Sequence, residues 1–449
     1  MPNLFGTDGI RGRSNKEMTP ELAYKLGKAI AILLWEGSIK RSRPLVGVAQ
    51  DTRTSSNMLF TALSSGLMSY GADVLYFGVL PTPGLSMLTR RFGADASVMV
   101  SASHNPMEDN GLKVLNSVGL KMQEAEEELL EQLMESDHKP VSWDHIGQLH
   151  YVSNSTQLYG DEILEKTHLM LDQVPLVVDV AHGATYAAAP YVLQKAGARV
   201  HTLFATPDGY WINHGCGATN LEPLKEVVKT MGVPLGFAFD GDGDRVMAVT
   251  SSGRVLDGDD LMAIIVKYLS QRRLWDPKLV VGTLMTNSGF EEFLKKMGGE
   301  LVRTNVGDKY VSDSMRENGA MLGGEPSGHV IYTPVNLTGD GIGIMATVLS
   351  ILNQTGQSPE ELLKDVNKKT QKTVNVPLGK RLNGSSFDIA QLPELRQLVE
   401  DYSGQGMRIV LRPSGTEPLL RITIEGEEEQ VSQALEAIVP LVERIFKGD

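Results

Sequence analysis

A run of alternating carboxylates is the first feature of the chain that could do chemistry. It reads Asp240-Gly241-Asp242-Gly243-Asp244-Arg245. The carboxylates repel one another, and the intervening glycines let the backbone curl so that their oxygens converge on one cation. A hard divalent metal would relieve that repulsion, so the segment predicts a metal site. The calcium-loop alternative fails, because the sixth position is Arg245 and the twelfth is Ser251. A plain acidic turn remains the other interpretation.

A candidate nucleophile lies in a second loop, which reads Ser101-Ala102-Ser103-His104-Asn105-Pro106 and follows an expected strand at 96–100. Short polar side chains at the carboxyl end of a strand in an open α/β sheet are placed where such sheets bind ligands. Ser103 is therefore the candidate. The Gly-x-Ser-x-Gly elbow of hydrolases is absent. The alternative is a turn whose hydroxyls cap the following backbone.

A third loop offers groups that suit a sugar. It reads Gly324-Glu325-Pro326-Ser327-Gly328-His329. In an extended segment side chains alternate, so Glu325, Ser327 and His329 would share one face. An acceptor, a hydroxyl and an imidazole in a row suit vicinal hydroxyl groups. A glycine-rich turn with an incidental histidine is the alternative.

A fourth loop has the parts of a phosphate clamp. It reads Arg412-Pro413-Ser414-Gly415-Thr416-Glu417-Pro418, with Arg421 just beyond. Arginine supplies a planar fork of donors, the hydroxyls add more, and the glycine exposes backbone N–H groups. A polar hairpin loop is the alternative. Near the N-terminus, Phe5-Gly6-Thr7-Asp8-Gly9-Ile10-Arg11-Gly12 offers another cation beside glycine turns.

A recurring strand, loop, helix and strand pattern must position these loops. It starts at residues 45, 176 and 279, and its apolar strands are typical of parallel sheets covered on both faces. The spacing is too long for a solenoid, so we predict three related α/β domains in tandem. A small α+β domain with strands at 407–411 and 419–425 and a helix at 427–446 should follow, after an exposed connection at 367–380. The expected domains are 1–153 with the Ser103 loop, 154–256 with the metal loop, 257–368 with the sugar loop, and 373–449 with the phosphate clamp.

Composition excludes several classes of function. The 449 residues carry 42 Lys and Arg against 55 Asp and Glu, a formal charge of −13, which argues against a nucleic-acid partner. The single cysteine, Cys216, rules out an intrachain disulfide. No basic and apolar leader and no run of about 20 apolar residues is present, so we expect a cytoplasmic protein with no membrane partner. An ATP P-loop and a dinucleotide-binding Gly-x-Gly-x-x-Gly are also missing.

Together the motifs resemble a known family. The segments 5–12, 101–106, 240–245, 324–329 and 412–418, in this order and at these separations, look like the five marks of the α-D-phosphohexomutases. The resemblance spans the whole chain. Within the family, the chain is most similar to the bacterial branch that acts on glucosamine phosphate. The similarity lies in the amino-acid sequences of segments 5–12, 213–222, 306–311 and 412–418.

The resemblance implies four domains around a central cleft, each giving one loop. Ser103 would be phosphorylated, and its phosphate oxygen with Asp240, Asp242 and Asp244 would hold Mg²⁺. Phospho-Ser103 would convert glucosamine 6-phosphate into a 1,6-bisphosphate intermediate and then into glucosamine 1-phosphate, a precursor for UDP-N-acetylglucosamine and the cell wall. Glucosamine 1,6-bisphosphate or glucose 1,6-bisphosphate would serve as activator. Sugar phosphates would be the partners, and the family often forms homodimers.

The resemblance also implies roles for individual side chains. Arg245 and His104 would lie beside the reacting phosphate. Lys113, Arg11 and His329 are candidates for handling the proton of the sugar hydroxyl, and the sequence leaves that choice open. The expected substrate-binding residues are Thr7, Glu325, Ser327, His329, Arg412, Ser414, Gly415, Thr416 and Arg421.

Two departures bear on the sugar. Pro326 stands where relatives of the glucosamine type carry glutamine, and Asn305 stands where lysine is expected. Proline removes a backbone donor and a side-chain amide. A phosphomannomutase or phosphoglucomutase of the same family is therefore an open alternative. A sugar-phosphate phosphatase and a non-catalytic sugar-phosphate binder are two further alternatives.

Overall fold

The computed structural model describes residues 4–6, 8–37, 41–377, 392–413 and 419–447. The chain forms two compact units. The first contains residues 1–283 and 297–363, and the second contains residues 284–296 and 364–449. Among the described residues, no helix is both long enough and apolar enough to span a membrane.

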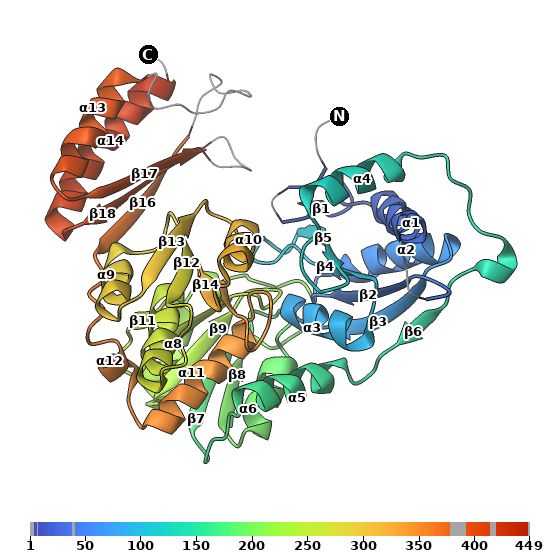
Figure 1. The fold of residues 1–449 in the computed structure, drawn as a ribbon, viewed down its shortest axis with the longest axis horizontal. Helices are drawn as coiled ribbons and strands as arrows, with labels where there is room; N and C mark the ends of the chain where they lie inside the picture. The colour runs from blue at the N-terminus through green and yellow to red at the C-terminus, as the bar shows by residue number, and fades with distance from the viewer. Residues whose placement is uncertain (1–3, 7, 38–40, 378–391, 414–418, 448–449) are drawn as a thin grey trace. The chain divides into compact units, whose positions relative to one another are not determined.

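The first sheet of unit 1 carries the Ser103 loop. Its strand order is β1-β5-β4-β2-β3-β6, with β2, β3, β4 and β6 parallel and β5 antiparallel to β4 and β1. Helices α1, α2 and α4 cover one face and α3 the other (Figure 1). The central strands β2 and β4 are almost wholly buried, which explains their continuous apolar sequences. The bounds are β1 Ile10–Arg13, α1 Pro20–Glu36, β2 Leu45–Gln50, α2 Ser56–Ser69, β3 Asp73–Val79, α3 Thr82–Phe92, β4 Ala96–Val100, β5 Asp109–Asn116, α4 Glu124–Met134 and β6 Leu149–Tyr151.

The second sheet carries the metal loop. Its order is β11-β10-β9-β7-β8, and the loop joins the antiparallel neighbours β9 and β10. Every residue of β9 is buried, so the end of this strand delivers the loop into the interior. The bounds are α5 Ser155–Thr167, β7 Pro175–Asp179, α6 Ala188–Lys195, β8 Arg199–Leu203, α7 Glu222–Met231, β9 Leu235–Phe239, β10 Val246–Thr250 and β11 Val255–Leu256.

The third sheet carries the sugar loop in a hairpin. Its order is β13-β12-β14-β15, and β14 and β15 are the antiparallel arms of that hairpin. Helix α11 is buried from Gly341 to Ile351, which fits its nearly uncharged sequence. The bounds are α8 Gly258–Arg272, β12 Leu279–Thr283, β13 Glu300–Thr304, α10 Asp308–Asn318, β14 Leu322–Gly324, β15 Val330–Tyr332, α11 Gly341–Thr355 and α12 Pro359–Leu362.

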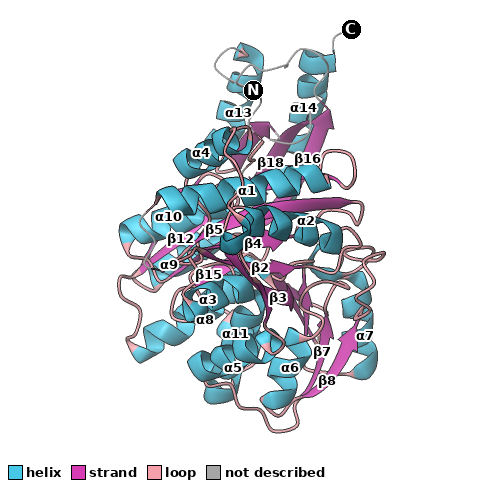
Figure 2. Cartoon of the chain, turned by 90° about the vertical axis from the view of Figure 1, so that its right-hand side faces the viewer, coloured by secondary structure: helices cyan, strands magenta, loops and turns pink. Residues whose placement is uncertain are grey.

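Unit 2 is a three-stranded antiparallel sheet, β16-β18-β17, packed against helices α13 and α14 (Figure 2). Its core joins Ile422 and Ile424 of the central strand to Val431, Ile438 and Val442 of α14. The bounds are α9 Ser288–Lys296, β16 Thr370–Pro377, α13 Pro393–Gly404, β17 Arg408–Pro413, β18 Leu419–Gly426 and α14 Glu428–Lys447.

The expected exposed connection at 367–380 is wrong over most of its described length. Strand β16 pairs with β18 over eight positions, from Thr370 opposite Gly426 to Pro377 opposite Leu419. It is an edge strand, so polar residues alternate with the inward-facing Val374 and Val376. That half-polar composition is what made it look like a linker.

The fold class predicted from the sequence is confirmed: three α/β domains in tandem, each with its own sheet, precede a C-terminal sheet with two helices. The expected strand at 96–100 is β4. The domain boundaries themselves stay a prediction.

Candidate active site

Ser103 is buried at the end of β4, and its hydroxyl donates to Asp240 Oδ2 at 2.7 Å. Its backbone has a φ of 53°, in the left-handed region that few residues other than glycine adopt. The Ser103 N–H donates to Ser101 Oγ at 2.9 Å, and His104 Nδ1 lies 3.3 Å from Ser103 Oγ. The first two of the predicted loops therefore meet.

The metal loop gathers three carboxylates. One oxygen from each of Asp240, Asp242 and Asp244 lies within 4.8 Å of the others, and all three residues are buried. Gly243 adopts a φ of 72°, and a Cβ on Gly241 would lie 2.5 Å from the carbonyl oxygen of Ser103. Glycine is thus required at position 241 because the two loops touch there.

The electrostatics of this group fit a divalent cation. Burial raises the pKa of Asp240 well above its ordinary value, and repulsion from Asp244 and Asp242 adds to the shift. Burial alone would also raise the pKa of Asp242, but the charge and hydrogen bond of Lys113 lower it instead. Asp242 Oδ1 and Asp244 Oδ1 are buried without a hydrogen-bond partner. An all-oxygen donor set with two unpartnered oxygens suits Mg²⁺.

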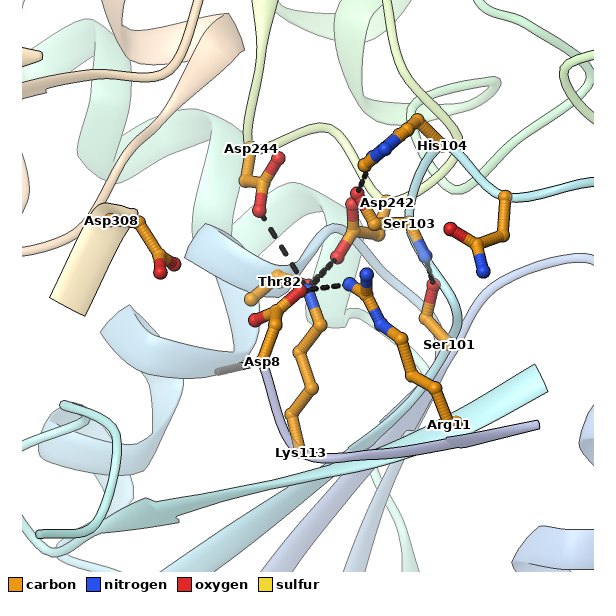
Figure 3. Close-up of polar contacts among 12 residues, drawn as sticks. Asp8, Arg11, Thr82, Ser101, Ser103, His104, Lys113, Asp242, Asp244 and Asp308 are labelled. Atoms are coloured by element: carbon orange, nitrogen blue, oxygen red, sulfur yellow. Dashed lines mark hydrogen bonds and ion pairs between the residues drawn. The ribbon is translucent and has the colours of Figure 1, made fainter. Parts of the chain in front are cut away.

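Two cations reach the carboxylates from neighbouring strands (Figure 3). Lys113 on β5 is buried, and its Nζ lies 2.8 Å from Asp242 Oδ2 and 3.7 Å from Asp244 Oδ2. Arg11 on β1 pairs in register with Gly111 of β5, which brings it beside Lys113. Burial lowers the pKa of Arg11, although Asp242 and Asp244 oppose that shift.

The sequence analysis missed a set of carboxylates and one cation that organise these side chains. Asp8 pairs with Arg11, lies 3.1 Å from Lys113 Nζ and accepts from Lys121. Lys121 also donates to Asp308 Oδ2 at 2.5 Å. Asp8 lies within segment 5–12, so its charge was a usable signal, whereas nothing in the neighbouring sequence marks Lys121.

Thr82, at the start of α3, was missed as well. Its hydroxyl donates to Asp242 Oδ2 at 2.6 Å, and its N–H donates to the carbonyl of Asp242 at 2.9 Å. Helix α3 of the Ser103 domain thereby fixes the position of Asp242, the middle carboxylate of the metal loop.

The sugar loop is a tight turn, so the expected extended face is wrong. Gly328 N–H donates to Glu325 O at 3.1 Å, and Gly328 adopts a φ of 92°. Glu325 and His329 are buried and face each other at the base of the hairpin, where Glu325 N–H donates to His329 O at 2.9 Å. Ser327 is exposed at the tip. Proline at the second position and glycine at the fourth favour such a turn over an extended strand.

This hairpin joins the metal loop. Val246 N–H donates to Gly328 O at 3.1 Å, and the backbones of Arg245 and His329 form an isolated antiparallel β-bridge. A cavity is lined by side chains from both loops, from the Ser103 domain and from the start of α10, among them Lys113, Lys121, Asp244, Asp308 and His329. Unit 1 therefore brings the catalytic candidates to the sugar loop.

The remaining candidates belong to unit 2 or fall outside the described residues. Thr7, Ser414, Gly415 and Thr416 fall outside the described residues. Arg412 and Arg421 belong to unit 2, where they are directly paired across β17 and β18. Arg421 Nε is buried without a hydrogen-bond partner. Two arginines at directly opposite positions of neighbouring strands fit the anion-binding role expected for this loop.

Comparison with known families settles the class. Models of phosphoglucomutase/phosphomannomutase domains I, II and III match residues 2–140, 151–253 and 257–370, and the model of the C-terminal domain matches residues 363–440. The chain belongs to the phosphoglucomutase/phosphomannomutase family. The predicted α-D-phosphohexomutase resemblance is thereby confirmed.

Individual relatives of this family match over nearly their whole length. The chain is 40% identical to phosphoglucosamine mutase of Desulforamulus reducens, covering 97% of this chain and 98% of the relative. It is 39% identical to that of Anoxybacillus flavithermus, covering 99% and 100%. The chain is therefore an enzyme of the phosphosugar mutase class, an intramolecular phosphotransferase that acts on small-molecule sugar phosphates.

Solved structures support the same fold. A phosphoglucomutase/phosphomannomutase family protein from Burkholderia thailandensis aligns with a TM-score of 0.80 at 23% identity, covering 98% of each chain. N-acetylphosphoglucosamine mutase of Aspergillus fumigatus, in complex with GlcNAc-6P and magnesium, aligns at 0.62 and 17% identity, covering 98% of this chain and 95% of that one. At these identities the likeness concerns the fold.

Proposed function

We propose that this enzyme interconverts glucosamine 6-phosphate and glucosamine 1-phosphate through phospho-Ser103 and a 1,6-bisphosphate intermediate. The observation that carries the proposal is the contact of Ser103 Oγ with Asp240, at the edge of three buried carboxylates. A nucleophile held against a metal-binding group is the arrangement that phosphoryl transfer needs. The product would feed UDP-N-acetylglucosamine and cell-wall synthesis in the cytoplasm.

Asp240, Asp242, Asp244 and an oxygen of phospho-Ser103 would hold Mg²⁺. When bound, the ion neutralises charge on the phosphoryl oxygens as they move toward the transition state. The chain supports this arrangement with Lys113, which occupies Asp242 Oδ2 and leaves Oδ1 for the ion.

His104 Nδ1 lies 3.3 Å from Ser103 Oγ, and the Arg245 N–H donates to Asp240 Oδ1 at 3.1 Å. Both side chains would lie beside the phosphoryl group carried by Ser103. Burial, together with the charges of Arg245 and Arg11, lowers the pKa of His104 to about 3, so its ring is neutral near pH 7. A neutral ring can donate one hydrogen bond to a phosphoryl oxygen without neutralising the nearby carboxylates. The guanidinium of Arg245 supplies the positive charge.

Lys113 is the favoured proton carrier among Lys113, Arg11 and His329. Its Nζ is the nitrogen that lies within 4 Å of two metal-loop carboxylates, and Asp8 holds it from the other side. A group in this position can give its proton to a departing sugar oxygen or receive one from an attacking hydroxyl. Arg11 lies beside it, and His329 belongs to the sugar loop.

Glu325, Ser327 and His329 would recognise the sugar hydroxyls. Thr7, Arg412, Ser414, Gly415, Thr416 and Arg421 would bind the substrate, the last five holding the phosphate that is not reacting. Glu325 Oε1 also accepts from Gly307 N–H at 3.1 Å, which orients the carboxylate.

The amino sugar is proposed because the relatives at about 40% identity are named phosphoglucosamine mutases. Phosphomannomutase or phosphoglucomutase activity is the second candidate, because Pro326 and Asn305 depart from the glucosamine pattern. Pro326 lies at the second position of the turn, where the fixed φ of proline fits. Proline therefore favours the turn, which offsets the absence of the glutamine side-chain amide at this position.

Initial rates with glucosamine 6-phosphate, glucose 6-phosphate and mannose 6-phosphate, each with a trace of glucose 1,6-bisphosphate as activator, test the proposal. We expect the highest kcat/KM with glucosamine 6-phosphate. A preference for either neutral hexose would replace the proposed substrate, and release of free phosphate faster than isomerisation would identify a phosphatase. Size-exclusion chromatography with light scattering tests the proposed homodimer.

A further inference from the structure

Ser103 occupies a backbone conformation that must be imposed from outside. A φ of 53° places it in the left-handed region, which costs a residue with a Cβ about 1 kcal/mol or more. Such a conformation persists only where surrounding groups hold it. The groups that hold it here are the two side chains that bond its carbonyl.

Arg53 is the first of them. It is the largest fully buried side chain of the described residues, and each of its guanidinium nitrogens donates a hydrogen bond. Nε donates to Asp51 Oδ2 at 2.9 Å. One terminal nitrogen donates to the carbonyls of Pro106 and Asp109, and the other donates to the carbonyls of Ser103 and Asn105, both at 2.9 Å. One side chain thus gathers three carbonyls of the Ser103 loop and the carbonyl of Asp109 at the start of β5.

Asn213 is the second, and it comes from the domain that carries the metal loop. Its Nδ2 donates to the carbonyl of Ser103 at 2.8 Å and to that of Asn105 at 3.1 Å. Its own backbone has a φ of 61°, and its N–H donates to Ala181 O at 3.0 Å. Arg53 and Asn213 therefore bond the same two carbonyls from two different domains.

We propose that Arg53 and Asn213 are positioning residues that act through the carbonyls of Ser103 and Asn105 to hold Ser103 Oγ against Asp240. This rests on the proposed role of Ser103 as phosphoryl carrier. Because Asn213 belongs to the same domain as the metal loop, it sets the register between the nucleophile and the carboxylates. The role concerns the reaction step, since neither side chain is placed among the sugar-binding groups.

Asn213→Gly tests the proposal with little backbone disturbance, because glycine tolerates a positive φ while the side chain that carries the amide donor is removed. We expect kcat to fall about tenfold or more with KM within about twofold of wild type, since misplacement of a reacting group by a fraction of an ångström lowers the rate of the chemical step. Tyr210→Ala is the matched control. It removes a larger, exposed side chain from the same loop and should leave kcat, KM and Tm unchanged.

Arg53→Lys supplies a second measurement, made at a temperature where far-UV circular dichroism shows the variant folded. If both residues act through the same carbonyls, the kcat effects of the two substitutions should be non-additive in the double variant. Additive effects, or an Asn213→Gly variant with wild-type kcat, would overturn the inference.

Ser103→Ala, assayed alongside, separates this inference from the proposed function. Full activity of Ser103→Ala would reject the phosphoserine mechanism and the inference with it. An inactive Ser103→Ala variant beside a fully active Asn213→Gly variant would reject the positioning role alone.

Discussion

Replacing Asp240 with asparagine should stabilise the protein in the absence of metal and remove its stabilisation by Mg²⁺. Asp240, Asp242 and Asp244 place carboxylate oxygens within 4.8 Å of one another, where two like charges repel by about 3.5 kcal/mol at an effective dielectric constant of about 20. Asparagine carries no charge, keeps an oxygen for the Arg245 N–H that donates to Asp240 Oδ1, and has an amide that can donate to Ser103 Oγ. The variant therefore removes the repulsion and can keep both local hydrogen bonds.

Proton uptake limits the size of this effect. The ordinary pKa of Asp240 is 3.8, and burial with two like charges raises it. If Asp240 is protonated in the folded protein, it avoids the repulsion at a cost of about 1.36 kcal/mol for each pH unit above its ordinary pKa. The repulsion can therefore lower the free energy of unfolding by at most about 4 kcal/mol at pH 7 and about 1.6 kcal/mol at pH 5. Lys113 and Arg245 offset part of it, which leaves an expected gain of about 1–4 kcal/mol at pH 7.

The sign of the pH dependence follows from the raised pKa. Between its ordinary value and its raised value, Asp240 holds more protons in the folded than in the unfolded protein, so the stability of the metal-free protein falls as pH rises through that window. The Asp240→Asn variant lacks this titration. Its stability advantage over the wild type should therefore grow between pH 5 and pH 8.

Thermal unfolding in chelator and in excess Mg²⁺, at pH 5 and pH 8, measures both effects. Asp179→Asn is the control, because Asp179 is a buried carboxyl of the same sheet, whose pKa burial raises to about 6, and it lies outside the metal loop. That variant should keep the wild-type rise in Tm on adding Mg²⁺. A metal-free Asp240→Asn variant less stable than wild type at pH 8, or one that Mg²⁺ stabilises as much as wild type, would refute the reasoning.

Three other substitutions give further expectations. Ser103→Ala should lose the phosphate that intact-mass analysis detects on active enzyme, together with turnover; phosphate retained elsewhere on a fully active variant would contradict the mechanism. Gly241→Ala should lower kcat by about a hundredfold, because its Cβ would lie 2.5 Å from Ser103 O, whereas Gly404→Ala, with open space around the added methyl group, should not. Arg412→Ala should raise KM about ten- to a hundredfold while Ser103 phosphorylation and Mg²⁺ binding persist, and an unchanged KM would remove Arg412 from the phosphate clamp.

Local features of the chain were predictable where one short segment carried the whole signal. The three carboxylates of 240–244 are separated by glycines that let the backbone curl, so their convergence could be predicted from the segment alone. The buried strands β2 and β4 were equally predictable, because a strand covered on both faces must be apolar along its length. Each of these predictions depends on neighbours within about six residues.

The predicted extended conformation of the sugar loop was wrong because two local sequence signals competed. Alternation of Glu325, Ser327 and His329 suggested a strand, while Pro326 and Gly328 favoured a turn. The turn forms because the antiparallel arms β14 and β15 must be joined there. The prediction of an exposed connection at the position of edge strand β16 failed for a related reason, since only one face of this strand needs apolar residues.

By itself, the sequence determined the chemistry that each loop could offer: a serine, three carboxylates, a glutamate with a histidine, and an arginine clamp. Only the tertiary structure decided which of these meet. Lys121 joins Asp8 across 113 residues and Asp308 across 187, and Asn213 reaches Ser103 across 110. Such contacts follow from sheet order and domain packing, which depend on the burial of many apolar side chains at once. No short segment encodes them, so the groups that position the nucleophile appear only when the chain is folded.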